Sequence, residues 1–270
     1  DGVIDIEDLR WEYLAEDGDF RSPEVLALRD EADIIITNPP FSLWRVFVAW
    51  LVDSGTQFAI IGNQNALTYK EVFPLIQENR VWLGKGFPRN MAHFRTPYTP
   101  HGKWIEQDGD DVVRVPGVQW FTNIDHGRRH EPLELMTMDD NIKFSKHAEV
   151  RGIGYRSYDN FDAIEVPFSD AIPGDYNGLM GVPVTFLAKY NPDQFEIVGI
   201  TQSWDGQASR IYPKQTQVSA KGVESAVTKL NDGAAIKVES PPEDKTYYTV
   251  GDEIFIKMYA RILIRRKDAS

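Results

Sequence analysis

The chain has 270 residues, of which 29 are basic and 41 acidic, so its net charge is −12, and it contains no cysteine. Its 42% hydrophobic and 12% aromatic residues are enough to bury a core, which excludes a disordered or low-complexity chain. The lack of cysteine excludes disulfide frameworks, thiolate zinc sites and cysteine nucleophiles.

The longest apolar run, from Phe41 to Val52, does not predict a membrane span. Arg45 interrupts the run, which is also shorter than the roughly 20 residues that cross a bilayer. No secretory signal peptide is recognisable. We therefore expect a soluble, cytoplasmic protein with no membrane partner.

The acidic charge is concentrated at one end of the chain. The first 33 residues hold twelve acids and three bases, a local net charge of −9, whereas the other 237 residues carry a net charge of only −3. Two stretches, 79–105 and 254–267, contain bases and no acid. Either stretch could face a phosphate backbone or be an ordinary solvated surface, so the net charge does not exclude nucleic acid as a partner.

Residues 32–123 alternate between strand and helix signals. The apolar, partly β-branched runs 32–37 and 57–62 predict strands buried on both faces, and 80–84 and 118–123 predict two more. Between them, Ser42 is expected to cap a helix that runs through Val52 and ends at Gly55. Thr68 and Glu71 are spaced as a capping box for a second helix toward residue 79, which Pro74 would kink or shorten.

This alternation predicts an α/β fold in which a mostly parallel, Rossmann-like sheet is flanked by helices. Residues 84–117 are rich in glycine, proline and charge, which predicts a long irregular loop of functional importance. From about residue 149, short extended segments (163–166, 182–187, 195–200 and 254–264) predict a mixed, β-rich extension. We expect one unit at 1–148 and an extension at 149–270, with an insertion or flexible hairpin at 203–249.

The motif Asn38-Pro39-Pro40-Phe41 follows the first predicted strand directly. Ligands of open α/β sheets bind at the carboxyl ends of strands, so this loop is expected to line a site. The two prolines stiffen it, because their φ angles are fixed and they lack N–H groups. Asn38 offers a side-chain acceptor and Phe41 a ring face for stacking. Together they suit a planar group with an exocyclic amine, such as adenine, cytosine or an amide.

The same loop predicts a way to activate such an amine. Its lone pair is delocalised into the ring, which makes it a poor nucleophile. If the Asn38 side-chain oxygen and the Pro39 carbonyl each accept one hydrogen, they favour a tetrahedral nitrogen that attacks a sulfonium methyl in line. Positioning and preorganised polarity would provide the catalysis, and no strong base is needed.

A second candidate site lies 19 residues upstream of Asn38, at Asp19 and Phe20. This spacing accommodates one helix and the next strand. The carboxylate could accept a hydrogen bond from the adenine amine of a nucleoside cofactor while the ring packs beside it. Taken alone, the segment could equally be a solvated acidic turn.

Several segments in register resemble the EcoRI-type adenine-specific DNA methyltransferase family. The segments that carry the resemblance are DGDFRS (17–22), DIIITNPPFSLWR (33–45), ALTYKEVFPLIQENRVWLG (66–84), WFTNID (120–125), YDNFDAIEV (158–166), DYNGLMGVPVTFLAKYNPDQFEIVG (175–199) and ARILIRRK (260–267). The resemblance implies S-adenosylmethionine as methyl donor, adenine N6 in double-stranded DNA as acceptor, with the base flipped out of the stack, and a cognate restriction endonuclease as functional partner.

The resemblance also implies that 1–148 is a partial catalytic core and 149–270 a target-recognition, DNA-binding extension. Residue roles follow from the same resemblance. Asn38 and Pro39 would bind the target amine, with Pro40 completing the rigid loop, and Phe41 would stack on the base. Asp19 and Phe20 would border the cofactor adenine, together with Asn38. The Gly-rich or Asp-Pro turn that holds the methionine part of the cofactor in such enzymes is not visible before Asp17, so we expect an incomplete cofactor site in this chain.

Basic side chains near these motifs are candidate DNA contacts. They are Arg80, Lys85, Arg89, Arg95, Lys103, Arg128 and Arg129. His126 and His130 have a metal-ligand spacing, but the loop sequence between them favours a basic cluster, and we expect no metal. Two alternatives remain open: methylation of a protein glutamine amide or an RNA amino group, and a catalytically incomplete DNA-binding relative.

Overall fold

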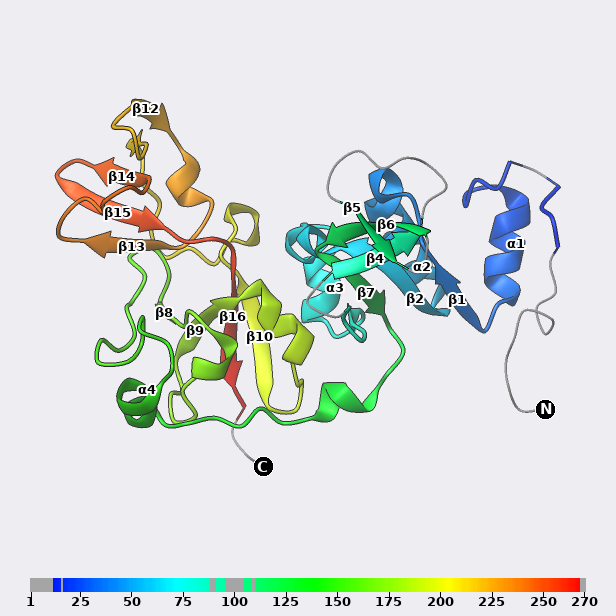
Figure 1. Ribbon diagram of the computed structural model, residues 1–270, viewed down its shortest axis with the longest axis horizontal. Helices are drawn as coiled ribbons and strands as arrows, with labels where there is room; N and C mark the ends of the chain where they lie inside the picture. The colour runs from blue at the N-terminus through cyan, green and yellow to red at the C-terminus, as the bar shows by residue number, and fades with distance from the viewer. Residues whose placement is uncertain (1–11, 16, 88–90, 96–103, 108–109, 268–270) are drawn as a thin grey trace.

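The computed structural model describes residues 12–15, 17–87, 91–95, 104–107 and 110–267. Two lobes lie side by side, an N-terminal lobe built around β1, β2 and β7 and a C-terminal lobe that contains β8 to β16 (Figure 1). Among the described residues, no helix combines the length and apolar character needed to cross a membrane.

The N-terminal sheet has the strand order β1-β2-β7-β3. Its strands are β1 (Ile34–Thr37), β2 (Gln57–Asn63), β7 (Val118–Thr122) and β3 (Trp82–Leu83). These confirm the four predicted strands, but the expected burial of the first on both faces was wrong, since Ile34 and Ile36 of β1 are 47% and 70% exposed. Only β1 and β2 pair in parallel, and β7 is antiparallel to both of its neighbours. The pairings therefore show a mixed sheet where a mostly parallel one was expected. Helical crossovers keep β1, β2 and β3 in one direction, whereas β7 returns beside β3 without a helix.

Three helices accompany this sheet. They are α1 (Pro23–Glu31), α2 (Trp44–Ser54) and α3 (Phe73–Gln77). Ser22 caps α1 by accepting a hydrogen bond from the Val25 amide at 3.3 Å. Helix α2 ends as predicted at Gly55, which adopts the left-handed conformation with φ 72°.

Both predicted helix starts were wrong. Ser42 lies within a 3-10 helix, Phe41–Leu43, that precedes α2, and so does not cap it. Thr68 ends another 3-10 helix, Gln64–Thr68, and α3 begins only at Phe73. Pro74 lies in the first turn of α3, where its fixed φ and missing N–H are favourable, so it helps to start the helix and does not kink it.

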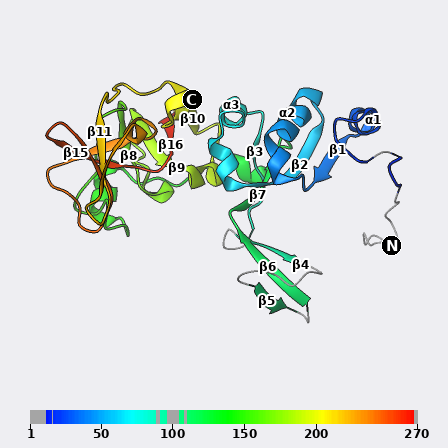
Figure 2. The ribbon, with the colours of Figure 1, turned by 90° about the horizontal axis from the view of Figure 1, so that it is seen from above.

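The predicted irregular segment 84–117 contains a three-stranded antiparallel sheet, which we call the arm. Its strands are β4 (Met91–Arg95), β6 (Asp110–Pro116) and β5 (Trp104–Gln107), in that spatial order. The arm projects from the N-terminal lobe (Figure 2). The expectation of a structureless loop was wrong because apolar and polar residues alternate along β4 and β6, a strand pattern that the glycines and prolines around it obscured.

The C-terminal lobe contains two sheets and α4 (Met138–Phe144). The first sheet has the order β10 (Phe195–Ile200), β16 (Arg261–Arg266), β9 (Leu179–Pro183) and β8 (Ala163–Glu165). The predicted strand at 182–187 is displaced, because β9 ends at Pro183 and a 3-10 helix, Val184–Lys189, follows. The predicted segment 254–264 is two strands, and they belong to different sheets.

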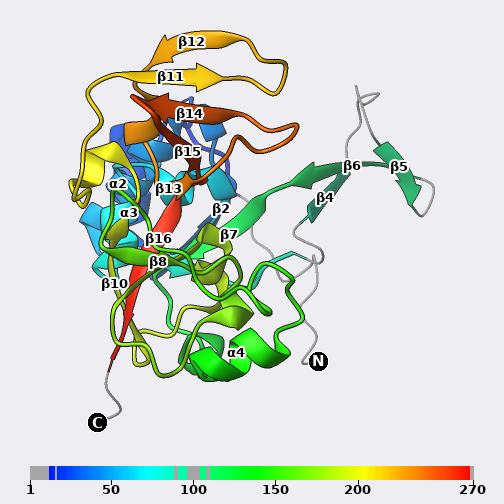
Figure 3. The same ribbon diagram turned by 90° about the vertical axis from the view of Figure 1, so that its left-hand side faces the viewer.

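The second sheet of this lobe is antiparallel throughout. Its order is β12 (Glu224–Val227), β11 (Gln215–Val218), β14 (Tyr247–Val250), β15 (Glu253–Lys257) and β13 (Ala235–Val238), stacked at the top of Figure 3. Segment 203–249 thus provides four of the five strands, with its own small core around Tyr212, Leu230 and Phe255. The segment is therefore an ordered subdomain and not a flexible hairpin. The sequence did not indicate this because the segment has few long apolar runs.

One apolar core joins the two lobes. Buried residues of α2, β2 and α3 belong to the same cluster as those of β9, β10 and β16. The Gln77 side chain donates to the Val198 carbonyl at 2.8 Å, and Phe73 packs edge-to-face on Trp204 at 6.0 Å. The division at residue 148 stays a prediction. The hydrogen bonds of Leu133 with Gln194 and of Met138 with Asp175 favour an earlier boundary.

Candidate active site

The Asn38–Phe41 loop lies at the carboxyl end of β1, as predicted. Pro39 is buried, whereas Asn38 and Pro40 are exposed and 46% of Phe41 is accessible. An exposed aromatic ring beside two prolines is available to stack on a ligand.

Trp44 anchors the loop to the sheet. Its indole nitrogen donates to the Ile61 carbonyl at 3.0 Å, and its ring packs edge-to-face on Phe121 at 4.7 Å. Gly62 leaves the space for this ring, since a Cβ there would lie 2.6 Å from it. The first residue of α2 is thus tied to β2 and β7, so the loop before it starts from a rigid base.

Two cavities meet at this loop. The first, of about 540 Å³, is lined by Asn38, Pro39 and Pro40 together with residues of 14–28, β1 and α2. The second, of about 410 Å³, is lined by the same three residues and by Phe41, Phe94 and Val115. The structure therefore places Asp19 and Phe20 in one cavity and Phe41 in a neighbouring one, and Asn38, Pro39 and Pro40 line both. We call the cavities the upstream and the downstream pocket.

The upstream pocket combines one carboxylate with an apolar wall. Asp19 and Phe20 line it beside Phe47 and Trp50 of α2. Phe20 is buried and packs edge-to-face on Phe47 and Trp50, with centroids 5.1 and 5.5 Å apart. Its ring therefore supports the wall of the pocket and is also part of the core.

Asp19 is held as an anion. Arg21 donates to it from its backbone amide and its guanidinium, and these bonds lower the pKa of Asp19 to about 2. The carboxylate is therefore ionised at neutral pH and can only accept hydrogen bonds. Because two carboxylate oxygens offer about four lone-pair sites, it retains capacity for a ligand amine beside its bonds to Arg21.

The downstream pocket contains residues that sequence reasoning missed. Phe94 of β4 and Val115 of β6 lie in the arm and face Asn38–Phe41 across this cavity. The alternation of apolar Ala92 and Phe94 with basic His93 and Arg95 was the signal that could have revealed an inward face.

Comparison with known proteins identifies the family of the chain. A family model described as adenine-specific methyltransferase EcoRI matches residues 1–267. The chain belongs to this family. It is 42% identical over 193 residues to the type II methyltransferase M.EcoRI of Escherichia coli. The aligned region covers 70% of this chain and 56% of that protein.

Two further relatives come from mycoplasmas. The type II methyltransferases M.MpnI of Mycoplasma pneumoniae and M.MgeORF184P of Mycoplasma genitalium are each 36% identical, over 68% of this chain and 57% of their own length. The chain thus spans little more than half the length of the curated relatives it matches. No solved structure matches it.

The candidate DNA contacts of this EcoRI-family chain fall into separate groups. Lys85 and Arg128 are exposed, and Arg80 is half exposed with Glu78 at 3.6 Å. Arg95 is exposed on β4 and has an interaction partner. Arg89 and Lys103 lie outside the described residues.

Arg129 is a packing residue in this structure. Only 11% of its side chain is exposed, its guanidinium lies 3.9 Å from the centre of the Trp82 ring, and it donates to the Asn79 side chain at 2.7 Å. Arg114, which the sequence analysis did not single out, is exposed on β6 opposite His93 of β4. The arm therefore presents a basic outer face where a phosphate backbone could lie.

The basic stretch 254–267 is partly engaged in contacts within the C-terminal lobe. Arg261 pairs with Glu165, Lys267 donates to the Pro192 carbonyl at 2.7 Å, and burial lowers the pKa of Lys257. Arg265 is 48% exposed with Glu196 at 3.7 Å, so part of the basic charge of this stretch lies on the surface.

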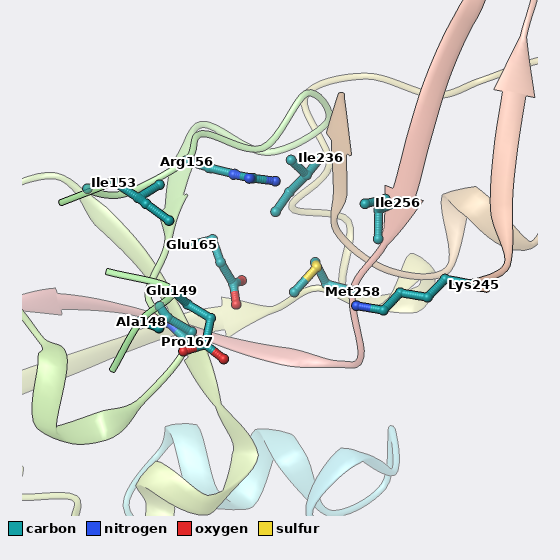
Figure 4. Close-up of a pocket in the computed structure, with 11 residues that line it drawn as sticks. Ala148, Glu149, Ile153, Arg156, Glu165, Pro167, Ile236, Lys245, Ile256 and Met258 are labelled. Carbon is teal, nitrogen blue, oxygen red and sulfur yellow. The ribbon is translucent and has the colours of Figure 1, made fainter. Parts of the chain in front are cut away.

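A third cavity, of about 510 Å³, lies between the two sheets of the C-terminal lobe (Figure 4). Charged Arg156, Lys245 and Glu165 line it together with apolar Ile236, Ile256 and Met258, and Figure 4 shows Arg156 pointing toward Ile236 and Lys245 beside Met258. It shares no lining residue with the pockets at Asn38.

The two histidines near residue 128 do not form a metal site within the described part of the chain. His126 contacts the Leu83 carbonyl at 3.0 Å, whereas His130 lies between the carboxylates of Asp125 at 2.9 Å and Asp193 at 3.3 Å. His130 thus connects the end of the N-terminal lobe to the C-terminal one.

We expect His130 to titrate above its ordinary pKa of 6.5. The hydrogen bond to Asp125, followed by that to Asp193, raises the pKa of His130. This contact therefore stabilises the fold below pH 6.5 and loses its effect as the pH rises through the folded-state pKa. An NMR titration of the imidazole should show a lower midpoint in Asp193→Asn, and an unchanged midpoint would contradict the contact.

Proposed function

We propose that this chain carries the acceptor site and part of the donor site of a DNA adenine N6-methyltransferase. The observation that carries the proposal is that Asn38, Pro39 and Pro40 line both pockets. Group transfer needs donor and acceptor on two sides of one set of positioning groups, and this loop provides them. Membership of the EcoRI family supports the same reaction.

The upstream pocket fits the adenosyl part of S-adenosylmethionine. Asp19 can accept from the exocyclic amine of its adenine, and the apolar wall of Val25, Leu28 and Ile35 suits a planar ring. When bound, the cofactor supplies an electrophilic methyl group. Phe20 supports the apolar wall by packing on Phe47 and Trp50. Asn38 lines this pocket and the acceptor pocket alike.

The downstream pocket fits a base extruded from the duplex. The Asn38 side-chain oxygen and the Pro39 carbonyl would each accept one hydrogen of the adenine amine, which leaves the nitrogen lone pair localised and free to attack the methyl group. Phe41 stacks on the adenine ring, and the fixed φ angle of Pro40 keeps the loop rigid. The proton on the methylated nitrogen is lost readily to water, so none of these residues needs to act as a strong base.

We propose that further chain completes the donor pocket. No strand pairs with the outer edge of β1 in the described part of the chain, and Ile36 there is 70% exposed. The unpaired backbone edge of β1 is a place where another strand can pair, and the exposed Ile36 side chain leaves one face of β1 to be covered by further chain. Such a strand would reach the upstream pocket, where a turn for the methionine part of the cofactor is needed, and would restore the Rossmann-like sheet.

The same proposal covers the partners. Duplex DNA would lie against the arm and the C-terminal lobe, with Lys85, Arg95, Arg114 and Arg128 toward its phosphates. The C-terminal lobe would read the target sequence, and a cognate restriction endonuclease in the same cytoplasm would be blocked by the methylation. The type II methyltransferases that the chain matches support this assignment.

Transfer of a radiolabelled methyl group from S-adenosylmethionine tests the proposal in the full-length protein. The label should appear in duplex DNA and be recovered as N6-methyladenine after digestion. Label in protein glutamine or in RNA, with none in DNA, would replace the proposed substrate. Binding to DNA without any transfer would instead indicate a DNA-binding relative that has lost catalysis.

A further inference from the structure

We propose that Phe94 of the arm forms the second wall of the acceptor pocket and holds the extruded base against Phe41. Phe94 is then a specificity-determining residue, which makes the arm a part of the active site and not merely a surface for DNA. The proposal rests on the function proposed above, since it assumes that a planar base enters the downstream pocket.

The strand register gives the arm two unlike faces. Ala92 pairs with Val115 and Phe94 with Val113, so these four apolar residues share one face. His93 pairs with Arg114 on the other face, where both are exposed. The apolar face is the one that borders the catalytic loop, because Phe94 and Val115 line the pocket with Asn38–Phe41.

The position of this wall is set by the catalytic sheet itself. Strand β6 runs directly into β7, with only Gly117 between them at φ +71°. The Gly117 carbonyl accepts from the Gln64 amide at 2.6 Å, just beyond the end of β2. At the other root of the arm, Phe87 stacks on Trp120 of β7 at 6.3 Å. The arm is therefore fixed to β2 and β7, which are also the strands that Trp44 contacts at the end of the Asn38–Phe41 loop.

The chemistry of the pocket selects a planar aromatic occupant. Its volume of about 410 Å³ accommodates a purine with room for the sugar that carries it. Phe41 and Phe94 contribute the two rings, while Pro39, Pro40 and Val115 contribute rigid apolar contacts. Stacking of a base on a protein ring is worth about 1–3 kcal/mol, which corresponds to about 5- to 150-fold in an equilibrium.

A packing role for Phe94 alone predicts different behaviour. If the ring only stabilised the arm, a leucine of similar volume would replace it. If it holds the base, tyrosine replaces it and leucine does not, because leucine has no ring face. The effect also depends on extrusion, so a target adenine opposite an abasic site, which leaves the duplex more easily, should lose less.

The test compares Phe94→Ala, Phe94→Leu and Phe94→Tyr in the full-length protein, with Phe144→Ala as matched control. Phe144 is 70% exposed on α4 and lines neither pocket. Methyl transfer is measured with a normal duplex and with an abasic opposite strand. Base extrusion is followed by the fluorescence of 2-aminopurine placed at the target position.

We expect kcat/KM to fall about 5- to 150-fold in Phe94→Ala and Phe94→Leu and to stay within about threefold in Phe94→Tyr. The 2-aminopurine signal should fall in parallel, the abasic duplex should recover most of the rate, and Phe144→Ala should match wild type. Full activity in Phe94→Leu, or wild-type fluorescence in Phe94→Ala, would overturn the second wall and leave the proposed function intact. A wild-type protein that methylates no DNA would overturn both.

Discussion

Asn38→Ala is expected to lower the kcat of methyl transfer to DNA by about 10²- to 10³-fold, the effect of losing one preorganised polar group at a reacting centre. The side-chain oxygen is the only acceptor of the loop that substitution can remove, because the other is the Pro39 carbonyl. DNA affinity should change little, since contacts to phosphate supply most of it. Radiolabel transfer under single-turnover conditions measures the chemical step, and a fluorescent duplex measures binding.

Asn65→Ala is the matched control for this substitution. Asn65 is also an exposed asparagine of the N-terminal lobe, at the start of the turn after β2, and lines neither pocket at Asn38. It should keep the wild-type rate within about twofold. If Asn38→Ala transfers methyl groups as fast as Asn65→Ala, the amine is held elsewhere and the assignment of the loop is wrong.

The position of the Asn38–Phe41 loop could be predicted from sequence because its signals are local. A β-branched run, Asn38 and two prolines specify a strand and a stiff turn without help from distant residues, and Gly55 marks the end of α2 through its own backbone angle. Strand direction was not predictable in this way. Whether β7 is parallel or antiparallel depends on the connection before it, and the arm was hidden in that connection.

The charged residues show a second limit of sequence reasoning. Arg128 and Arg129 are neighbours, yet one is exposed and the other is stacked on Trp82 and bonded to Asn79. A run of basic residues indicates local positive charge, but it does not show which guanidinium is buried against other side chains and which is exposed to solvent. The position of Asp19 near Asn38, in contrast, could be predicted from the number of residues between them. That spacing fits one helix and one strand, and α1 and β1 occupy it.

The second large effect is expected in the buried ion pair of the C-terminal lobe. Arg261, at the start of β16, donates hydrogen bonds to Glu165 of β8 from its Nη2 at 2.7 Å and its Nε at 3.1 Å. The two side chains are only 11% and 7% exposed. Tyr158 also donates to Glu165, and burial together with this carboxylate raises the pKa of Tyr158 well above its ordinary value, so the phenol stays protonated.

Glu165→Ala should therefore destabilise the protein by about 3–5 kcal/mol, because it leaves the Arg261 charge buried without a partner. Urea denaturation followed by circular dichroism measures this change. Glu196→Ala is the matched control in the same sheet: Glu196 of β10 faces Arg265 at 3.7 Å with both side chains about half exposed, and its loss should cost less than about 1 kcal/mol.

A double substitution separates two contributions to the free energy of unfolding: the cost of burying the Arg261 charge without a partner, and the net stabilisation by the ion pair. Glu165→Leu with Arg261→Met removes both charges and keeps apolar volume between β8 and β16. It should recover most of the stability lost in Glu165→Ala, since apolar replacements of buried pairs are often neutral. Equal losses in Glu165→Ala and Glu196→Ala would show that water reaches Arg261, most directly from the adjoining cavity of Figure 4, which Glu165 lines.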